Sequence, residues 1–516
     1  MSAPVRAPSV PALAPFLDLC TSVTWMDDGS YRFVGGEPLA MLRLSGDAFR
    51  GIPFGVSPLY VRPDVAEHLY RRGLAHPTPI AFNDPGALEP PAPIDALSVV
   101  IPVRDDPEGL AALLASLDPV TSRGARIVIV DDGSAVPVSA ETLSAGGLGE
   151  QGESGNGGEV PGRGTPRVTV LRHDGSRGPA AARNAGIRAA EESGATEVLL
   201  LDADTSADGW DWLPLLRLHF ERESVVAVAP RIVAADPGHL GIRGFETAGS
   251  ALDMGDRPAR VASRTSVPYV PSAALLLHLP RLRALLGDSV EFFAEDMNVA
   301  EDVDLCWRIV TAGGEIRYEP LSRVAHRHRL ELLPMLRRRS FYGEGAARLA
   351  ASHEDEIVPA IFSVSTLVAA AGLWWWRPWS VAGAAAATAW SVRTLRRSLG
   401  GDTALVARVA AKSLDGAFWQ LASALLRPYA PATIAVIAAG LPTRTGRRAA
   451  RILAVAGVAE GLRHWWRKRP TQRLPVDGPL GHIALHRADD LAYGIGVWKS
   501  ALTARSPRAL IPEIRR

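Results

Sequence analysis

The chain has 516 residues, enough for several domains at about 150 residues each. Its 47% hydrophobic and 22% charged residues are ordinary for a globular protein, and a net charge of +1 gives no overall attraction to nucleic acid, which is not expected as a partner. The two cysteines, Cys20 and Cys306, lie in different predicted domains, so the composition indicates a reducing, cytoplasmic setting and no disulfide framework.

The N-terminal part is predicted to be a small module between two irregular segments. Residues 1–15 are interrupted by prolines and lack the apolar core of a signal peptide, which predicts a disordered leader. Over 16–85, a DDGS turn between two short strands and a helix in PDVAEHLYRRG, ended by Gly73, predict a winged-helix-like α+β module. The Pro- and Gly-rich residues 86–95 are expected to form a linker.

Residues 96–335 have the pattern of an α/β domain. LSVVIPV, RIVIVD and EVLLLD are apolar runs typical of central strands buried on both faces, and helical patterns lie between them. This alternation predicts a mostly parallel sheet. Within the domain, residues 135–166 are rich in Gly, Ser, Glu and Pro, which predicts a disordered insertion on a loop.

Two predicted strands end in paired carboxylates. Asp202 and Asp204 are two residues apart, so on a strand they would point to the same side and offer hard oxygen ligands to Mn²⁺ or Mg²⁺ carrying a diphosphate. Asp131 and Asp132 suit hydrogen bonds from a base imide or ribose hydroxyls. A simple turn is the alternative for each pair. Because ligands of such sheets gather at the carboxyl ends of strands, one shared site is expected.

A third acidic pair, Glu301 and Asp302, begins the predicted helix EDVDLCWRIV. The helix dipole favours a carboxylate there, and Asp302 is predicted to be a general base held in its ionised form; an N-cap is the alternative. His326 follows a short strand and can complete a metal site or contact the diphosphate, or else belong to a surface His–Arg cluster.

Residues 336–516 are predicted to be helical, hydrophobic and basic. The 20 residues 357–376 carry no charge and are long enough to span a bilayer, with Trp residues beside Arg377 as in an interfacial aromatic belt. From residue 391 to the end there are 21 Lys and Arg against 7 Asp and Glu, which suits an anionic surface. The pattern predicts association with the inner face of the cell membrane; buried helices of an α-helical domain are the alternative.

The motifs SVVIPVRD, VIVDDGS, RGPAAARNAGI, LLLDAD and AEDVDLCWRI occur in an order that resembles family-2 glycosyltransferases of the GT-A fold. The resemblance implies an inverting, metal-dependent hexosyltransferase that uses a nucleotide sugar. It implies a catalytic pair of Asp302 as base with Glu301, and a metal site of Asp204, Asp202 and His326. The residues that it places around the nucleotide sugar are Asp105, Asp131, Asp132, Arg183, Asn184 and Asp202.

The flanking segments RFVGGEPLAMLRLS, RRGLAHPTP, RRRSFYGEGAARLA and ADDLAYGIGVWKSAL resemble the mycofactocin-system glycosyltransferases. This likeness implies transfer of glucose from UDP-glucose to the peptide-derived redox cofactor mycofactocin or its precursor, and it implies that residues 16–85 are a peptide-recognition module. The alternative is a family-2 transferase that builds a lipid- or polysaccharide-linked glycan at the membrane. No QxxRW motif follows the acidic pair, which argues against a processive polysaccharide synthase.

Overall fold

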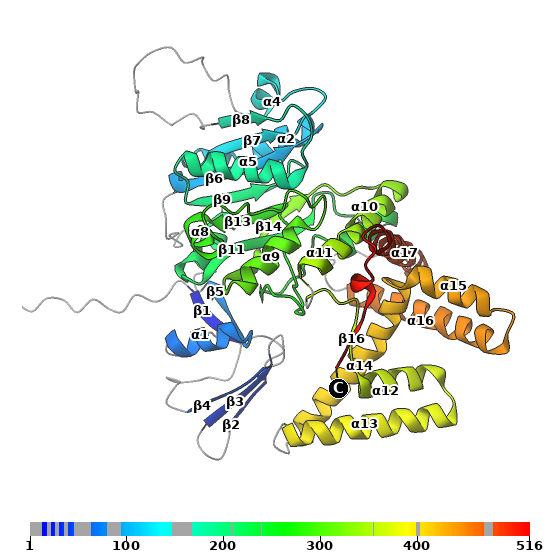
Figure 1. Ribbon diagram of the computed structural model, residues 1–516. Coiled ribbons are helices and arrows are strands. Elements are labelled where there is room, and N and C mark those ends of the chain that lie inside the picture. The colour runs from blue at the N-terminus through cyan, green and yellow to red at the C-terminus, as the bar shows by residue number, and fades with distance from the viewer. Residues whose placement is uncertain are drawn as a thin grey trace, which may run out of the picture. The chain divides into compact units, whose positions relative to one another are not determined.

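The computed structural model is shown in Figure 1. It describes residues 13–17, 22–25, 30–35, 40–45, 63–79, 94–146, 168–207, 209, 211–238, 240–353, 356–398, 403–468 and 478–515. These residues form two compact units, one of residues 1–235 with 251–327 and one of 236–250 with 328–516. Most of the predicted leader 1–15 and of the predicted linker 86–95 lies outside the described residues.

The N-terminal module contains two small sheets and a helix. Strand β1 (Leu13–Leu17) pairs with β5 (Ala75–Pro79), and β2 (Ser22–Trp25), β3 (Ser30–Gly35) and β4 (Ala40–Ser45) form an antiparallel sheet. The predicted strands around DDGS and the helix, α1 (Pro63–Arg71), are confirmed. Gly73 follows the helix with a φ of 63°, as predicted for its C-terminal end. The winged-helix-like class stays a prediction.

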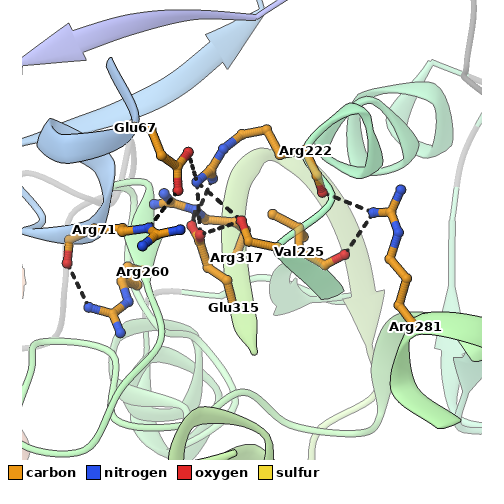
Figure 2. Close-up of polar contacts among 9 residues, drawn as sticks. Glu67, Arg71, Arg222, Val225, Arg260, Arg281, Glu315 and Arg317 are labelled. Atoms are coloured by element: carbon orange, nitrogen blue, oxygen red, sulfur yellow. Dashed lines mark hydrogen bonds and ion pairs between the residues drawn. The ribbon is translucent and has the colours of Figure 1, made fainter. Parts of the chain in front are cut away.

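An ionic cluster ties helix α1 to two strands, β11 and β14, of the large sheet described below (Figure 2). Arg222 donates to Glu67 of α1 at 2.9 Å and to Glu315, the first residue of β14, at 2.8 Å. The Arg222 guanidinium carbon lies 4.6 Å from the centre of the Tyr70 ring. Burial would raise the pKa of Glu67, but hydrogen bonding and charge from Arg222 outweigh it and lower the pKa. The module therefore contacts the amino-terminal ends of β11 and β14.

One nine-stranded sheet forms the centre of the first unit (Figure 1). Its order is β10-β14-β11-β13-β9-β6-β7-β8, with β12 paired to β14. The bounds are β6 Leu97–Val103, β7 Arg126–Asp131, β8 Val168–Arg172, β9 Glu197–Leu201, β10 Thr205–Ser206, β11 Val225–Ala234, β12 Ala259–Arg260, β13 Ala274–His278 and β14 Glu315–His326. Strands β10, β12 and β13 run antiparallel to their neighbours, and the remaining pairs are parallel, so the predicted mostly parallel α/β sheet is confirmed.

Helices cover both faces of this sheet because its central strands are apolar on both sides. Val99 and Ile101 of β6 share a buried cluster with Leu110 of α2 (Pro107–Ser116). On the other face, Gly186 of α5 (Pro179–Glu192) lies so close that a Cβ added there would be 2.3 Å from Val100 Cγ1. The other elements of this unit are η3 Ile94–Ala96, α3 Asp118–Thr121, α4 Ala140–Ala145, α6 Trp212–Leu218, η4 His219–Glu221, α8 Leu279–Leu286 and α9 Glu301–Thr311.

The predicted disorder of residues 135–166 is wrong for its first part. Ser139 caps helix α4, because its Oγ accepts a hydrogen bond of 3.2 Å from the backbone N–H of Thr142. A Cβ added to Gly146 would lie 2.7 Å from Leu114 Cβ, so the end of α4 packs against α2. The composition of residues 135–166 did not indicate this N-cap. The rest of the predicted insertion, from residue 147, lies outside the described residues.

The second unit is helical, as predicted, but its bounds differ. It starts at residue 328 instead of 336 and also includes residues 236–250. Its elements are α7 Gly241–Gly249, α10 Leu332–Glu344, α11 Ala346–Ser352, β15 Ile361–Ser363, α12 Val364–Trp375, α13 Pro378–Ser398, α14 Thr403–Leu426, α15 Ala430–Gly440, α16 Arg444–Lys468, α17 Pro479–Thr503, η6 Arg508–Leu510 and β16 Glu513–Arg515.

The apolar stretch 357–376 does not form the long helix expected of it. Strand β15 takes part of it, and a capping box at Ser363 starts α12, which has only 12 residues. Such a helix is about 18 Å long, against a hydrocarbon core of about 30 Å. In the part of the chain that the structure describes, no single helix is long and apolar enough to cross a membrane. Helices α14 and α15 taken together have the length and composition to cross one, but a bend of 81° separates them.

The contact between α10 and α17 depends on glycine. A Cβ added to Gly343 would lie 2.3 Å from the carbonyl oxygen of Tyr493, whereas none of the surrounding atoms lies within 4 Å of one added to Gly383 of α13. We expect Gly343→Ala to lower the free energy of unfolding by about 1–3 kcal/mol, because the two backbones must separate. Gly383→Ala should raise it by up to about 1 kcal/mol through helix propensity. Guanidinium unfolding of both variants tests this; equal shifts would contradict the predicted close packing.

Candidate active site

The loops that follow β6 and β7 are joined at the carboxyl edge of the sheet. Asp105 has a φ of 53°, a conformation that non-glycine residues seldom adopt. Its backbone N–H donates to Ser134 Oγ at 3.0 Å, and its carboxylate accepts from the N–H of Ala135 at 2.7 Å. The predicted nucleotide-site residues of these two loops are therefore brought together.

Asp131 has a structural role. Its side chain is 1% exposed, accepts from the N–H of Ser134 at 2.8 Å and forms an ion pair with Arg172. Burial would raise the pKa of this carboxyl, but the hydrogen bonds from Ser134, Val138 and Arg172 outweigh burial and lower the pKa. The turn alternative thus describes Asp131, and the nucleotide contact predicted for it has no support in this geometry.

Asp132 shapes the loop that leads into α5. Its carboxylate lies 2.7 Å from Nδ1 of His173, and it accepts from Ser176 Oγ at 2.7 Å. It also accepts from the backbone N–H groups of Arg177 and Gly178, each at 2.9 Å. These bonds outweigh the opposing effect of burial and lower the pKa of Asp132, so the group is ionised. Its contact with a nucleotide base stays a prediction.

The DAD motif forms a turn and is not part of a strand. Strand β9 ends at Leu201, so the prediction that Asp202 and Asp204 point to one side is wrong. The Asp202 carboxylate accepts from Arg183 at 2.7 Å. Asp204 instead lies 3.2 Å from Nε2 of His326, because β10 pairs with the end of β14. The structure therefore brings Asp204 and His326 together and turns Asp202 toward α5.

Arg183 connects the DAD turn to the acidic pair. Its side chain is 5% exposed and donates to Asp202 at 2.7 Å and to Glu301 at 2.8 Å. Burial would lower the pKa of Arg183, but the charges of Asp202 and Glu301 outweigh burial and raise the pKa. Glu301 is thus an ion-pair partner, and Arg183 is expected to act on a substrate only through these carboxylates.

Asn184 fixes the segment that precedes α9. Its amide donates to the carbonyl oxygen of Phe293 at 2.8 Å and accepts from the N–H of Phe293 at 3.0 Å. The residue is 1% exposed. The nucleotide contact predicted for Asn184 is therefore wrong for this geometry, because its polar atoms bond to the Phe293 backbone and to the Glu295 carboxylate.

Asp302 is the second residue of α9, which begins at Glu301, so the N-cap alternative is excluded. Burial raises its pKa to about 7; the charge of Glu301 adds to the rise, and the charge of Arg183 offsets part of it. The prediction that the helix dipole keeps Asp302 ionised is wrong, since burial has the larger effect. A carboxyl that titrates near neutrality suits a general base.

Asp204 and His326 fit a divalent metal ion. They offer a carboxylate oxygen and an imidazole nitrogen 3.2 Å apart. Two ligands about 2.1 Å from an octahedral ion and at right angles are about 3 Å apart, so both atoms can bind one ion. Among the described residues, no third His, Cys, Asp or Glu joins them in a group with all ligand atoms within 4.8 Å. Asp202 is therefore not a third ligand in this arrangement.

The sequence motifs did not indicate several residues that contribute contacts at this edge of the sheet. Arg327, next to His326, forms an ion pair with Asp106, and its N–H donates to the carbonyl oxygen of Asp204 at 2.9 Å. Asp106 also caps α2, which its position before Pro107 could have indicated. Glu295 accepts from Arg177 at 3.0 Å, and nothing in the local sequence marks that pairing. These contacts join the loops around the candidate site.

Residues 98–244 match the model of glycosyl transferase family 2. The pre-mycofactocin glycosyltransferases of Mycobacterium tuberculosis strains CDC 1551 / Oshkosh and ATCC 25618 / H37Rv are each 37% identical over 507 residues, or 95% of this chain and 96% of theirs. Among solved structures, the mannosyltransferase PcManGT from Pyrobaculum calidifontis, in complex with GDP-Man and Mn2+, gives a TM-score of 0.35 at 16% identity over 75% of this chain and 93% of that chain. S. aureus TarS 1-349 gives 0.36 at 14% identity over 77% and 90%. From its likeness to the mycobacterial enzymes over nearly its whole length, the chain belongs to the pre-mycofactocin glycosyltransferases of family 2.

Proposed function

We propose that this glycosyltransferase moves glucose from UDP-glucose to mycofactocin or its precursor, with inversion at the anomeric carbon and with Mn²⁺ or Mg²⁺. The acceptor is proposed from the full-length likeness to enzymes of that name. The observation that carries the chemistry is Asp302, a half-buried carboxyl whose pKa is raised to about 7, beside Asp202 and Glu301, which both pair with Arg183. This is the state required of a base that removes a proton from a hydroxyl.

In the proposed reaction, Asp302 accepts the proton of the acceptor hydroxyl. The hydroxyl oxygen forms a bond to the anomeric carbon as the bond from that carbon to the diphosphate breaks on the opposite face, which inverts the configuration. Asp204 and His326 would hold the metal ion, which when bound neutralises the charge of the departing diphosphate. Arg183 keeps Asp202 and Glu301 paired, while burial and the charge of Glu301 raise the pKa of Asp302 to about 7.

The same proposal places the enzyme at the inner face of the cell membrane. Exposed apolar side chains support it: Trp376, Trp379 and Trp466 of the second unit are 71%, 70% and 64% exposed. Aromatic side chains of this kind gather where protein meets the membrane interface.

The transfer itself is tested by incubating the purified protein with Mn²⁺, UDP-glucose and the mycofactocin precursor. We expect mass spectrometry to show the precursor plus one or more hexose units, because one donor glucose is added in each turnover. UDP-galactose serves as the matched donor control and should give a much weaker series. Release of UDP without any gain in precursor mass would keep the transferase chemistry and reject the acceptor.

Asp302→Asn should reduce transfer by at least about 10²-fold, because only the acceptor of the proton is lost. Affinity for UDP-glucose should stay close to that of the wild type. In the wild type, kcat should rise as pH increases through about 7, as Asp302 loses its proton. Kinetics and calorimetric binding measure these effects, with Glu291→Gln on the exposed surface as control. Turnover by Asp302→Asn at the wild-type rate would reject this base.

Metal binding can be measured by electron paramagnetic resonance of Mn²⁺. Asp204→Asn and His326→Ala should each weaken Mn²⁺ binding by at least about tenfold, since each removes a ligand. Asp202→Asn should change the affinity much less, because that carboxylate pairs with Arg183. EDTA should abolish transfer and added Mn²⁺ restore it; full activity in EDTA would refute the metal role.

A further inference from the structure

A pocket of about 420 Å³ lies in the second unit, between the end of α12 and helices α14, α15 and α16. Its volume falls in the range of about 300–1,000 Å³ that is usual for small-ligand sites. The main apolar residues that line it are Trp374, Trp375, Leu425, Val436, Ile437 and Leu453. None of the residues that line the pocket is charged, so the pocket belongs neither to the carboxylate site nor to its chemistry.

The pocket offers few hydrogen-bonding groups to a sugar, a nucleotide or a peptide. The Tyr429 hydroxyl already donates to the carbonyl oxygen of Leu510 at 2.9 Å. That leaves the Thr433 hydroxyl and the indole N–H groups as polar side-chain groups of the lining. Polar ligands bound in an apolar site leave their own groups without partners, at a cost in free energy. A hydrocarbon chain is the ligand that such a wall favours.

The Trp374 indole N–H indicates where a polar end of the ligand would lie. It is buried, and the described residues offer it no hydrogen-bond acceptor. Its ring packs edge-on against Phe418, with the ring centres 5.8 Å apart. Buried indole N–H groups normally have a partner, and the ester carbonyl of a lipid is an acceptor at the end of a hydrocarbon chain.

The pocket opens toward an exposed apolar surface. Val436 lines the pocket and is also 71% exposed, so the wall continues to the outside. Trp376, which directly follows the lining residue Trp375, is exposed to the same extent. Large apolar side chains exposed together mark a surface that binds a partner or a membrane.

The charge beside the pocket is positive. Residues 416–459 contain no Asp or Glu, whereas α16 begins with Arg444, Arg447, Arg448 and Arg451. Arg448 donates to the carbonyl oxygen of Trp375 at 2.7 Å, which attaches this basic helix end to the pocket wall. Basic clusters beside apolar surface bind anionic lipid headgroups.

We propose that this pocket binds one acyl chain of an anionic phospholipid of the membrane, with the arginines at the start of α16 beside its headgroup. The inference rests on the proposed membrane association and extends it to a defined lipid site. The pocket and the basic surface would add one apolar and one electrostatic contact with the membrane lipids.

The test uses the full chain and vesicles of phosphatidylglycerol or phosphatidylcholine, each with a trace of phosphatidylglycerol that carries a diazirine on its acyl chain. We expect flotation with phosphatidylglycerol vesicles, weaker binding to phosphatidylcholine, and photo-cross-links confined to peptides of α12, α14, α15 and α16. Ala449→Trp should reduce these cross-links at least about fivefold, because the indole fills the space of the chain. Ala386→Trp, on the exposed side of α13, is the matched control and should keep them.

The outcomes separate the two proposals. Vesicle binding with cross-links spread outside the pocket, in the wild type itself, would overturn the lipid site and keep the membrane association. No binding to either vesicle would overturn both, while the transfer assay in solution would still report on the glycosyltransferase. The wild-type cross-link map decides the question even when Ala449→Trp does not fold.

Discussion

The candidate active site depends on one buried guanidinium, that of Arg183. The DAD turn and the start of α9 come from distant parts of the chain, and both present carboxylates to a poorly hydrated region. Without a cation between them, the half-buried Asp202 and the buried Glu301 would both lose their ion-pair partner, which is destabilising. Arg183, 5% exposed, binds both at once and holds the turn and the helix in register.

The same pairing explains how neighbouring carboxyls acquire different roles. Arg183 uses its two terminal nitrogens on Asp202 and Glu301, so Asp302 receives its charge only at a distance. Burial and the negative charge of Glu301 then dominate, and the pKa of Asp302 rises to about 7. Asp131 and Asp132 experience burial too, but several hydrogen bonds to each one lower the pKa. Differences in local partners, with the same side-chain chemistry, thus separate the proposed base from carboxylates that stay ionised.

The sequence predicted the parts of this site that local pattern controls. Apolar runs located β6, β7 and β9, and sheet topology then required their polar ends to meet at one edge. The sequence did not predict contacts between distant residues: the amide of Asn184 forms a hydrogen bond with Phe293, 109 residues away. The side-chain alternation of a strand also gave a wrong orientation for Asp202, because the strand ends one residue earlier. Motif order locates a site, but only packing decides which oxygen faces the ligand.

The second unit shows the same limit for hydropathy. A window over residues 357–376 counts apolar side chains, whereas the capping box at Ser363 decides that the helix starts late and cannot span a bilayer. Trp376 is 71% exposed, which favours the proposed membrane association over a domain whose tryptophans are all buried. What remains is an apolar surface without a spanning helix among the described residues, beside a run of arginines. The proposed membrane association accounts for both features, because an anionic membrane interface offers partners to the indole rings and to the positive charges.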